Sequence, residues 1–241
     1  MKLSIVIPAF NEEKLIGRCL EHVSEALRAN ASNEWSAEVI VVDNNSTDGT
    51  ADLARSAGAE VVFEPINQIS RARNAGGGAA QGDWFLFIDA DSFLDAASVA
   101  DLLRCIVQGK MAGGGCVVGL DEAPAYVFPL IRLCNYLMCT LRWAAGSFVF
   151  CRRDAFLEIG GFSTDLYAAE EIDFSRKLKG WAKQKGLGFA VLRDQAHLSS
   201  GRKFYLYSRW EVLRHVLRSL FFLRWTIRDR KKLDFFYDGR R

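Results

Sequence analysis

Phe85-Leu86-Phe87-Ile88-Asp89-Ala90-Asp91-Ser92 is the stretch around which the chain is organised, because a run of large apolar residues ends in two carboxylates one residue apart. Continuous apolar runs are typical of strands buried on both faces, so residues 84–88 predict the middle of a parallel sheet covered by helices. In open α/β sheets ligands bind outside the carboxyl ends of the strands, where Asp89 and Asp91 are expected. Two carboxylates there suit Mg²⁺ or Mn²⁺, which complete their shells with water and phosphate oxygens. The alternative is that both acids only cap the helix that follows.

Strands and helices alternate along the rest of the chain. Short apolar runs predict strands over residues 3–7, 39–42, 61–63 and 189–192, the first ended by Pro8, and helical spacing of apolar residues predicts helices over 15–27, 51–57, 69–80 and 99–107. Strands separated by helices of this length are expected to pair in parallel through right-handed crossovers. The predicted fold class is therefore α/β, a single domain with a mostly parallel sheet flanked by helices, whose first hundred residues form a nucleotide-binding half.

No common phosphate-binding fingerprint accompanies that half. Gly76-Gly77-Gly78 lies inside a helical pattern and not directly after a strand, and the chain has no G-x-x-x-x-G-K-[ST] loop. Rossmann dehydrogenases and P-loop enzymes are therefore disfavoured, and a nucleotide must be held by other residues. The formal net charge of +2 gives no reason to expect nucleic acid as a partner.

The sequence also carries predictions about where the protein works. Six cysteines without a C-x-x-C pair or zinc-like spacing are typical of a reducing compartment. The N-terminus passes within a few apolar residues into Asn11-Glu12-Glu13, which indicates a first strand and not a signal peptide. No stretch of about 18 uncharged residues is present, so a spanning helix is not expected. We expect a cytoplasmic protein, with the cytoplasmic face of a membrane as the second location.

Eight short stretches follow one another in a defined order along residues 3–180. They are 4–13 (SIVIPAFNEE), 41–50 (VVDNNSTDGT), 71–76 (RARNAG), 89–91 (DAD), 144–147 (AAGS), 153–156 (RDAF), 160–162 (GGF) and 169–173 (AEEID). Jointly they resemble the family 2 glycosyltransferases, which have a GT-A fold. The resemblance implies a GT-A domain over residues 1–203, with a nucleotide-binding half (1–110) and an acceptor half (111–203), followed by a basic tail over 204–241.

The resemblance also implies roles for individual residues in binding a nucleotide sugar. Pro8, Ala9, Phe10 and Glu12 would line the nucleoside pocket, Asp43 would bond the base or ribose, Arg71 and Asn74 would flank the nucleotide and sugar, Asp89 would contact the ribose or donor sugar, and Asp91 would bind the metal. These segments lie at carboxyl ends of strands, where backbone donors and helix N-termini are exposed. Taken alone, Phe10 also fits core packing and Asp43 also fits a turn.

Catalysis is expected at Glu170-Glu171-Ile172-Asp173, which resembles the acidic motif of the family. Transfer to a hydroxyl by single displacement needs a base near the acceptor and a stabilised diphosphate leaving group. Glu171 occupies the base position, but the family usually has Asp there, and the extra methylene leaves Glu170 as the alternative base. The same acids also suit the first turn of a helix.

Two residues near the end of the domain are further candidates by resemblance. His197 follows the last predicted strand, where some GT-A enzymes place a third metal ligand or a diphosphate contact. A single histidine is also commonly structural. Arg202 lies in Ser199-Ser200-Gly201-Arg202, which resembles a segment of part of the family, and a guanidinium group suits a diphosphate.

The tail over residues 204–241 is apolar and basic. If it is helical, its apolar side chains share one face and its arginines lie towards the other, which suits an anionic membrane interface. The competing interpretation is that this face packs on the domain or on a second subunit, so a homo-oligomer stays open. Residues 123–145 carry the same ambiguity.

The sequence therefore predicts a metal-dependent inverting glycosyltransferase using Mn²⁺ or Mg²⁺. The expected donor is a nucleotide sugar, UDP-linked in preference, and the acceptor is the hydroxyl of an unidentified glycan or lipid-linked molecule. One alternative is a sugar-phosphate nucleotidyltransferase. Such enzymes open with a glycine-rich phosphate loop, and residues 8–14 do not contain one. The other is a non-catalytic, membrane-associated nucleotide-sugar-binding protein, against which Asp91 and the Glu170-Glu171 pair argue.

Overall fold

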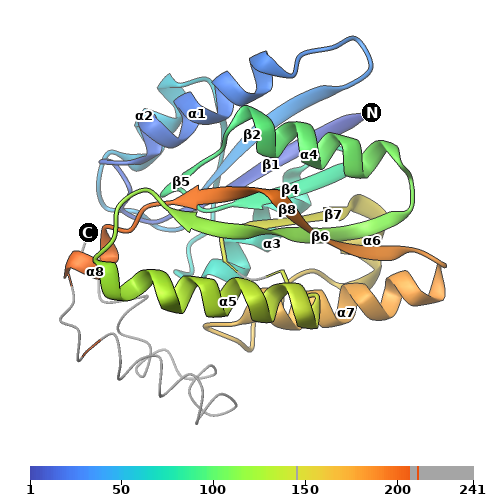
Figure 1. The fold of residues 1–241 in the computed structure, drawn as a ribbon. Coiled ribbons are helices and arrows are strands. Elements are labelled where there is room, and N and C mark those ends of the chain that lie inside the picture. Colours follow the sequence, from blue (N-terminus) through green and yellow to red (C-terminus); the bar gives the residue numbers. More distant parts are fainter. Residues whose placement is uncertain (145, 207–210, 212–241) are drawn as a thin grey trace.

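A computed structural model describes residues 1–144, 146–206 and 211 (Figure 1). Its strands are β1 (Lys2–Ala9), β2 (Ser36–Asp43), β3 (Glu60–Phe63), β4 (Trp84–Ile88), β5 (Ser92–Phe93), β6 (Met111–Leu120), β7 (Phe148–Arg152) and β8 (Gly188–Ser199). Its helices are α1 (Ile16–Ala29), α2 (Thr50–Ser56), α3 (Ile69–Ala79), α4 (Ala96–Val107), the 3₁₀ turn η1 (Ala125–Val127), α5 (Phe128–Leu141), α6 (Arg153–Ile159), α7 (Glu170–Gln184) and α8 (Lys203–Leu206). The strands form one sheet in the order β3-β2-β1-β4-β7-β6-β8-β5.

The first four strands of that order pair in parallel, as the alternation of strands and helices predicts. The predicted end of the first strand at Pro8 is wrong, because β1 continues to Ala9 with Pro8 in register with Val42. Pro8 lies beyond Val6, the last residue of β1 paired with β4. A missing N–H is tolerated there as it is at a sheet edge.

The second half of the sheet is mixed. β7 is antiparallel to both β4 and β6, β6 and β8 are parallel, and the two-residue β5 is antiparallel to the end of β8. The short β5 is the continuation of the Asp89-Ala90-Asp91 turn, so the turn is held between the central strand β4 and the opposite edge of the sheet.

Helices cover both faces of the sheet and enclose two hydrophobic cores (Figure 1). Side chains alternate along β1, so Leu3 and Ile5 pack in the core with α1 and α4, whereas Val6 packs in the core with α3, α6 and α7. The glycines of α3 allow a close approach to the sheet, because a Cβ at Gly76 would lie 2.3 Å from Val6 Cγ1. This packing role explains a glycine run that does not form a phosphate loop.

The predicted tail lies almost entirely outside the described residues, which include only 204–206 and 211 of it. The helical membrane or packing interpretations of residues 207–241 are therefore not tested by the fold. In the part of the chain that the structure describes, no helix has both the length and the apolar character needed to cross a bilayer.

Candidate active site

A cavity of about 240 Å³ opens where the carboxyl ends of β1, β2 and β4 meet the start of α7. Its lining comes from six parts of the chain and comprises Pro8, Ala9, Phe10, Glu12, Asn44, Asn67, Ile69, Arg73, Asp89, Ala90, Asp91, Gly146, Tyr167, Ala168, Ala169, Glu170 and Glu171. Eight of the fourteen residues predicted for the site are in this lining: Pro8, Ala9, Phe10, Glu12, Asp89, Asp91, Glu170 and Glu171. The strand-end acids and the acidic helix start thus face one space.

Hydrogen bonds between two loops shape the side of the cavity next to β1. Asn11 has a positive φ of 52°. Its backbone N donates to Ser46 Oγ at 3.0 Å, and its side-chain Oδ1 accepts from Thr47 N at 2.8 Å. Asp43 Oδ1 accepts from Ser46 N at 2.9 Å, so this carboxylate fixes the turn after β2 and lies beside the cavity lining. The turn role foreseen for Asp43 is therefore present in the structure.

Asp89 and Asp91 are not the cap of the following helix. That role belongs to Asp95, whose Oδ1 accepts from Ser98 N at 2.8 Å at the start of α4. The side chain of Asp89 is about one third exposed in the cavity, and Asp91 is buried at its wall. Both strand-end carboxylates therefore belong to the cavity lining and not to the helix cap.

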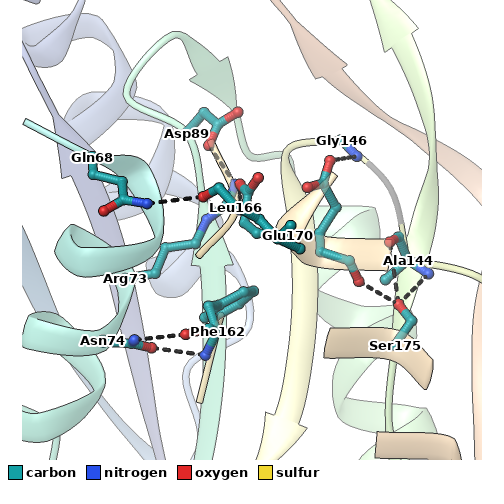
Figure 2. A network of polar contacts seen from close by, with 11 residues as sticks. Gln68, Arg73, Asn74, Asp89, Ala144, Gly146, Phe162, Leu166, Glu170 and Ser175 are labelled. Atoms are coloured by element: carbon teal, nitrogen blue, oxygen red, sulfur yellow. Dashed lines mark hydrogen bonds and ion pairs between the residues drawn. The ribbon is translucent and has the colours of Figure 1, made fainter. Parts of the chain in front are cut away.

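Arg73 connects the two halves of the site (Figure 2). Its side chain is 3% exposed, and it reaches from α3 to Glu170 Oε1 at 2.6 Å through Nη1 and to Asp89 Oδ1 at 3.1 Å through Nη2. The guanidinium also lies over the Phe162 ring, 5.2 Å from its centroid. One buried cation therefore joins the end of β4 to the first residue of α7.

Burial and charge act in opposite directions on this group of residues. Burial alone lowers the pKa of Arg73, but the charges of Asp89 and Glu170 outweigh it and hold that pKa above its ordinary value. Burial raises the pKa of Glu170 to about 8, and the neighbouring charge of Glu171 adds to this effect while Arg73 opposes it. Glu170 can thus hold a proton near neutral pH inside a site that also contains an arginine.

Glu171 projects from the first turn of α7 and accepts a long hydrogen bond of 3.4 Å from Gly146 N. The loop that carries Gly146 is fixed by Ser175, whose Oγ accepts from Ala144 N at 2.9 Å and contacts the Glu171 carbonyl at 2.8 Å (Figure 2). Asp173, the third predicted catalytic acid, is outside the lining and forms an ion pair with Lys177 at 3.1 Å. The helix-start and cavity roles of Glu170 and Glu171 therefore coexist.

Two residues predicted to flank the donor lie outside the lining. Arg71 Nε donates to Gln68 Oε1 at 3.1 Å, and the amide of Asn74 bonds both the N (2.8 Å) and the O (2.9 Å) of Phe162. Asn74 therefore positions the Gly161-Phe162 turn beneath Arg73. In the structure without ligand, neither side chain faces the cavity.

Arg202 is outside the cavity lining but binds one of its residues. Its Nη2 donates to Glu12 Oε2 at 2.9 Å, which joins the segment after β8 to the loop after β1. Two residues that the resemblance assigns to the donor thus bind one another. The Nε of Arg202 is buried and has no hydrogen-bond partner among the described residues.

The described part of the chain has no cluster of three or more His, Cys, Asp or Glu side chains able to hold a metal ion. His197 lies outside the cavity lining, fully buried in β8 with its ring 5.1 Å from that of Phe148. Both ring nitrogens have no hydrogen-bond partner among the described residues, and burial lowers the pKa of His197 to about 4, although Asp95 and Asp91 oppose the shift. The orphaned neutral imidazole and the Asp91 carboxylate fit a divalent ion whose remaining ligands come from phosphate and water.

Sequence reasoning missed Arg73 and Gln68. Helical periodicity contained a signal for Arg73, because Ile69 and Arg73 are one turn apart and both line the cavity, whereas Arg71 is on another side of α3. Gln68 is buried and donates from Nε2 to the carbonyls of Thr164 and Leu166 at 2.8 and 2.9 Å (Figure 2). Contacts across almost a hundred residues leave no local pattern.

Comparison with known proteins gives the same outline. A family model described as glycosyl transferase family 2 matches residues 4–160. An uncharacterized glycosyltransferase of Haemophilus influenzae is 26% identical over 187 residues, which cover 73% of this chain and 61% of that protein.

Two solved structures illustrate the similarity in fold. TarS 1-349 of S. aureus in complex with UDP-GlcNAc has a TM-score of 0.64 at 22% identity, over 83% of this chain and 58% of that one. The mannosyltransferase PcManGT from Pyrobaculum calidifontis, in complex with GDP-Man and Mn²⁺, has a TM-score of 0.64 at 21% identity, over 88% and 60%. At these identities they establish the fold, a GT-A-type single α/β domain with a curled sheet. The chain spans about three fifths of the length of each of these three proteins.

Proposed function

The chain belongs to glycosyl transferase family 2, and from this premise we propose that it is an inverting, metal-dependent enzyme whose donor is a UDP-sugar. The family selects glycosyl transfer over the nucleotidyltransferase and non-catalytic alternatives. The proposed acceptor is a hydroxyl of a glycan or lipid-linked molecule. The observation that carries the proposal is the convergence of Asp89, Asp91, Glu170 and Glu171 on one cavity.

The donor is proposed to enter the cavity beside β1, where Phe10 and Glu12 lie in the lining. Asp43 and Asn74 stay candidates for donor contacts only if the loops they hold move, because both side chains are engaged in fixing turns. TarS supports UDP as the nucleotide, and PcManGT makes GDP the comparison to test.

Asp91 would hold Mn²⁺ or Mg²⁺, with His197 as a second proposed ligand. When bound, such an ion would neutralise charge on the diphosphate leaving group. TarS has been crystallised with UDP-GlcNAc and PcManGT with GDP-Man and Mn²⁺, and the similarity in fold to both supports this assignment. Arg202 is proposed to exchange Glu12 for the diphosphate, since a guanidinium pairs with either anion.

The proton of the acceptor hydroxyl is proposed to pass to Glu171. Glu171 is in the cavity lining, and its carboxylate accepts one long hydrogen bond, from Gly146 N, within the described part of the chain. Glu170 is less suited to the role, because its carboxylate is buried and bound to Arg73 at 2.6 Å. Arg73 would therefore position the acidic pair without contacting the acceptor.

A thermal-shift screen tests the donor and the metal together. The full chain is heated with UDP, GDP, UDP-sugars and GDP-sugars, each with and without Mn²⁺, because a ligand that binds the folded state raises the unfolding temperature. We expect the largest shift with a UDP-sugar and Mn²⁺. A larger shift with the GDP series would replace UDP by GDP, and no shift with any nucleotide would contradict the proposal.

Calorimetry of Asp91→Ala with UDP and Mn²⁺ then tests the metal ligand. We expect at least about a tenfold loss of affinity, because removing even an outer partner of a metal site costs that much. Asp95→Asn is the matched control, since Asp95 caps α4 a few residues away and is absent from the cavity lining. Unchanged affinity and metal dependence in Asp91→Ala would remove the residue from the site.

A further inference from the structure

Helix α5 is fixed to the sheet by a polar side chain. The Asn135 amide accepts from Val118 N at 3.0 Å and donates to Val118 O at 2.8 Å. These bonds replace the ladder where the register between β6 and β8 shifts, between Cys116 and Val118. Met138, one turn further, is buried. Asn135 and Met138 therefore define the face of α5 that points to the domain.

The opposite face of α5 is apolar and exposed. It carries Leu133, Tyr136, Leu137 and Leu141, and further exposed apolar side chains are Phe128 at the start of α5, Tyr126 of η1, and Tyr205 and Leu206 of α8, with exposed fractions from 38% to 66%. Tyr126 OH lies 3.5 Å from the Phe204 carbonyl, which joins α8 to this surface. We call these eight residues the α5 face. Contiguous exposed apolar patches of this kind mark interaction sites.

The charged side chains of the segment that carries α5 have one sign. No Asp or Glu occurs between residues 123 and 153, while Arg132 is exposed on α5 and Arg142 follows its last turn. The chain leaves α8 beside this face, and residues 207–241 contain ten Arg and Lys against four Asp and Glu. If residues 207–241 covered the α5 face, positive charge would lie against positive charge. A partner that complements both the α5 segment and residues 207–241 is anionic.

We propose that the α5 face docks the protein onto an anionic lipid bilayer, lying in the plane of the headgroups. Burial of exposed Leu and Tyr side chains and attraction of Arg to anionic lipid are the two terms that hold peripheral helices at such surfaces. Figure 1 shows α5 as an outer helix, with α8 at one of its ends.

Docking in this orientation has a consequence for the acceptor, which rests on the proposed function. The loop after α5 carries Gly146, which lines the cavity and bonds Glu171. The bilayer would therefore lie beside the rim near the proposed base. An acceptor carried by a lipid would reach Glu171 without leaving the membrane.

Vesicle flotation with the full chain tests the surface without using enzymatic activity. Vesicles of phosphatidylcholine alone are compared with vesicles rich in phosphatidylglycerol, at low and high salt. The test variant is Leu133→Gln/Tyr136→Gln/Leu137→Gln, and the control Leu53→Gln/Val107→Gln/Leu157→Gln removes three equally exposed apolar side chains from α2, α4 and α6. We expect at least about a tenfold loss of binding to anionic vesicles in the test variant and about twofold or less in the control.

Arg132→Glu supplies a second variant with no apolar change, and it should weaken binding at low salt more than at high salt. Thermal unfolding of all variants shows that each is folded. Wild-type protein that ignores anionic vesicles, or a test variant that binds as wild type does, would overturn the proposal. A test variant that unfolds earlier with unchanged vesicle binding would assign the face to residues 207–241. Loss of a concentration-dependent dimer, again with unchanged vesicle binding, would assign the face to a second copy. If no nucleotide shifted the unfolding temperature in the thermal-shift screen, the proposed donor would be wrong, but the vesicle-binding result would not be affected.

Discussion

Two arginine–carboxylate contacts reach the same cavity from different parts of the chain, and they differ in enclosure. Arg73 is 3% exposed and binds Glu170 and Asp89, whereas Arg202 is 21% exposed and binds Glu12. The first cation lies between two anions contributed by different halves of the domain. Among the described residues, the second has one anion and a buried Nε without a hydrogen-bond partner. Enclosure makes the Arg73 contact part of the scaffold, while the Arg202 contact is the one that we propose is exchanged for a phosphate.

The largest expected effect distinguishes Glu171 from Glu170, the glutamate that binds Arg73. Glu171→Gln keeps the shape of the side chain and removes its basicity, so transfer should fall about 10²–10⁴-fold while donor affinity stays within a few fold. Single-turnover transfer and calorimetry measure the two quantities. Glu170→Gln is the control. If Glu170→Gln abolishes transfer and Glu171→Gln does not, Glu170 is the base. If both variants are active, Glu170 and Glu171 only stabilise the first turn of α7.

The free energy of unfolding tests whether the Arg73 and Arg202 contacts differ in enclosure. Arg73→Met removes the shared cation from the buried Glu170 and the partly exposed Asp89, so the free energy of unfolding should fall by about 3–5 kcal/mol. Arg202→Met is the matched variant and should cost roughly 1 kcal/mol, because its side chain is partly exposed. Urea unfolding of both variants gives the difference. Equal losses would show that the two contacts do not differ in the way the geometry indicates.

The pH dependence of stability sharpens the description of the Arg73 cluster. The pKa of Glu170 is raised to about 8 by burial, so between its unfolded value and that value the folded protein holds a proton that the unfolded chain has lost. Stability should therefore fall as pH rises from about 5 to about 8, and Glu170→Gln should remove most of this decrease. Urea unfolding at several pH values measures it. Parallel curves for the two proteins would mean that Arg73 keeps Glu170 ionised throughout.

The smallest expected effect concerns the exchange at Arg202. Arg202→Gln should weaken UDP binding about tenfold, the magnitude of one charge-assisted hydrogen bond, and leave uridine binding unchanged. Calorimetry with UDP and uridine in the presence of Mn²⁺ measures both. Equal losses for the two ligands would place Arg202 in the scaffold with Arg73.

The sequence predicts the parts of the site that depend on local patterns. The apolar run of β4 and the acids after it form a signal within eight residues, and the acidic start of α7 is equally local. Gln68 and Asn74 bind partners up to 98 and 88 residues away, and Arg73 binds Glu170 97 residues away, so the neighbours of these residues in sequence do not reveal those contacts. The antiparallel insertion of β7 next to β4 is non-local for the same reason.

The short β5 has a consequence for the order in which the molecule is built. Ser92 pairs with Ser199, and Ser200 N donates to the Asp91 carbonyl at 2.8 Å, so the backbone of the proposed metal ligand is held by residues more than a hundred positions later. Domains form as their chain emerges from the ribosome, N-terminal part first. A nascent chain that ends before β8 already contains every strand-end acid. We expect it to lack the geometry to capture a nucleotide sugar, so that donor binding begins only when the last strand of the sheet is in place.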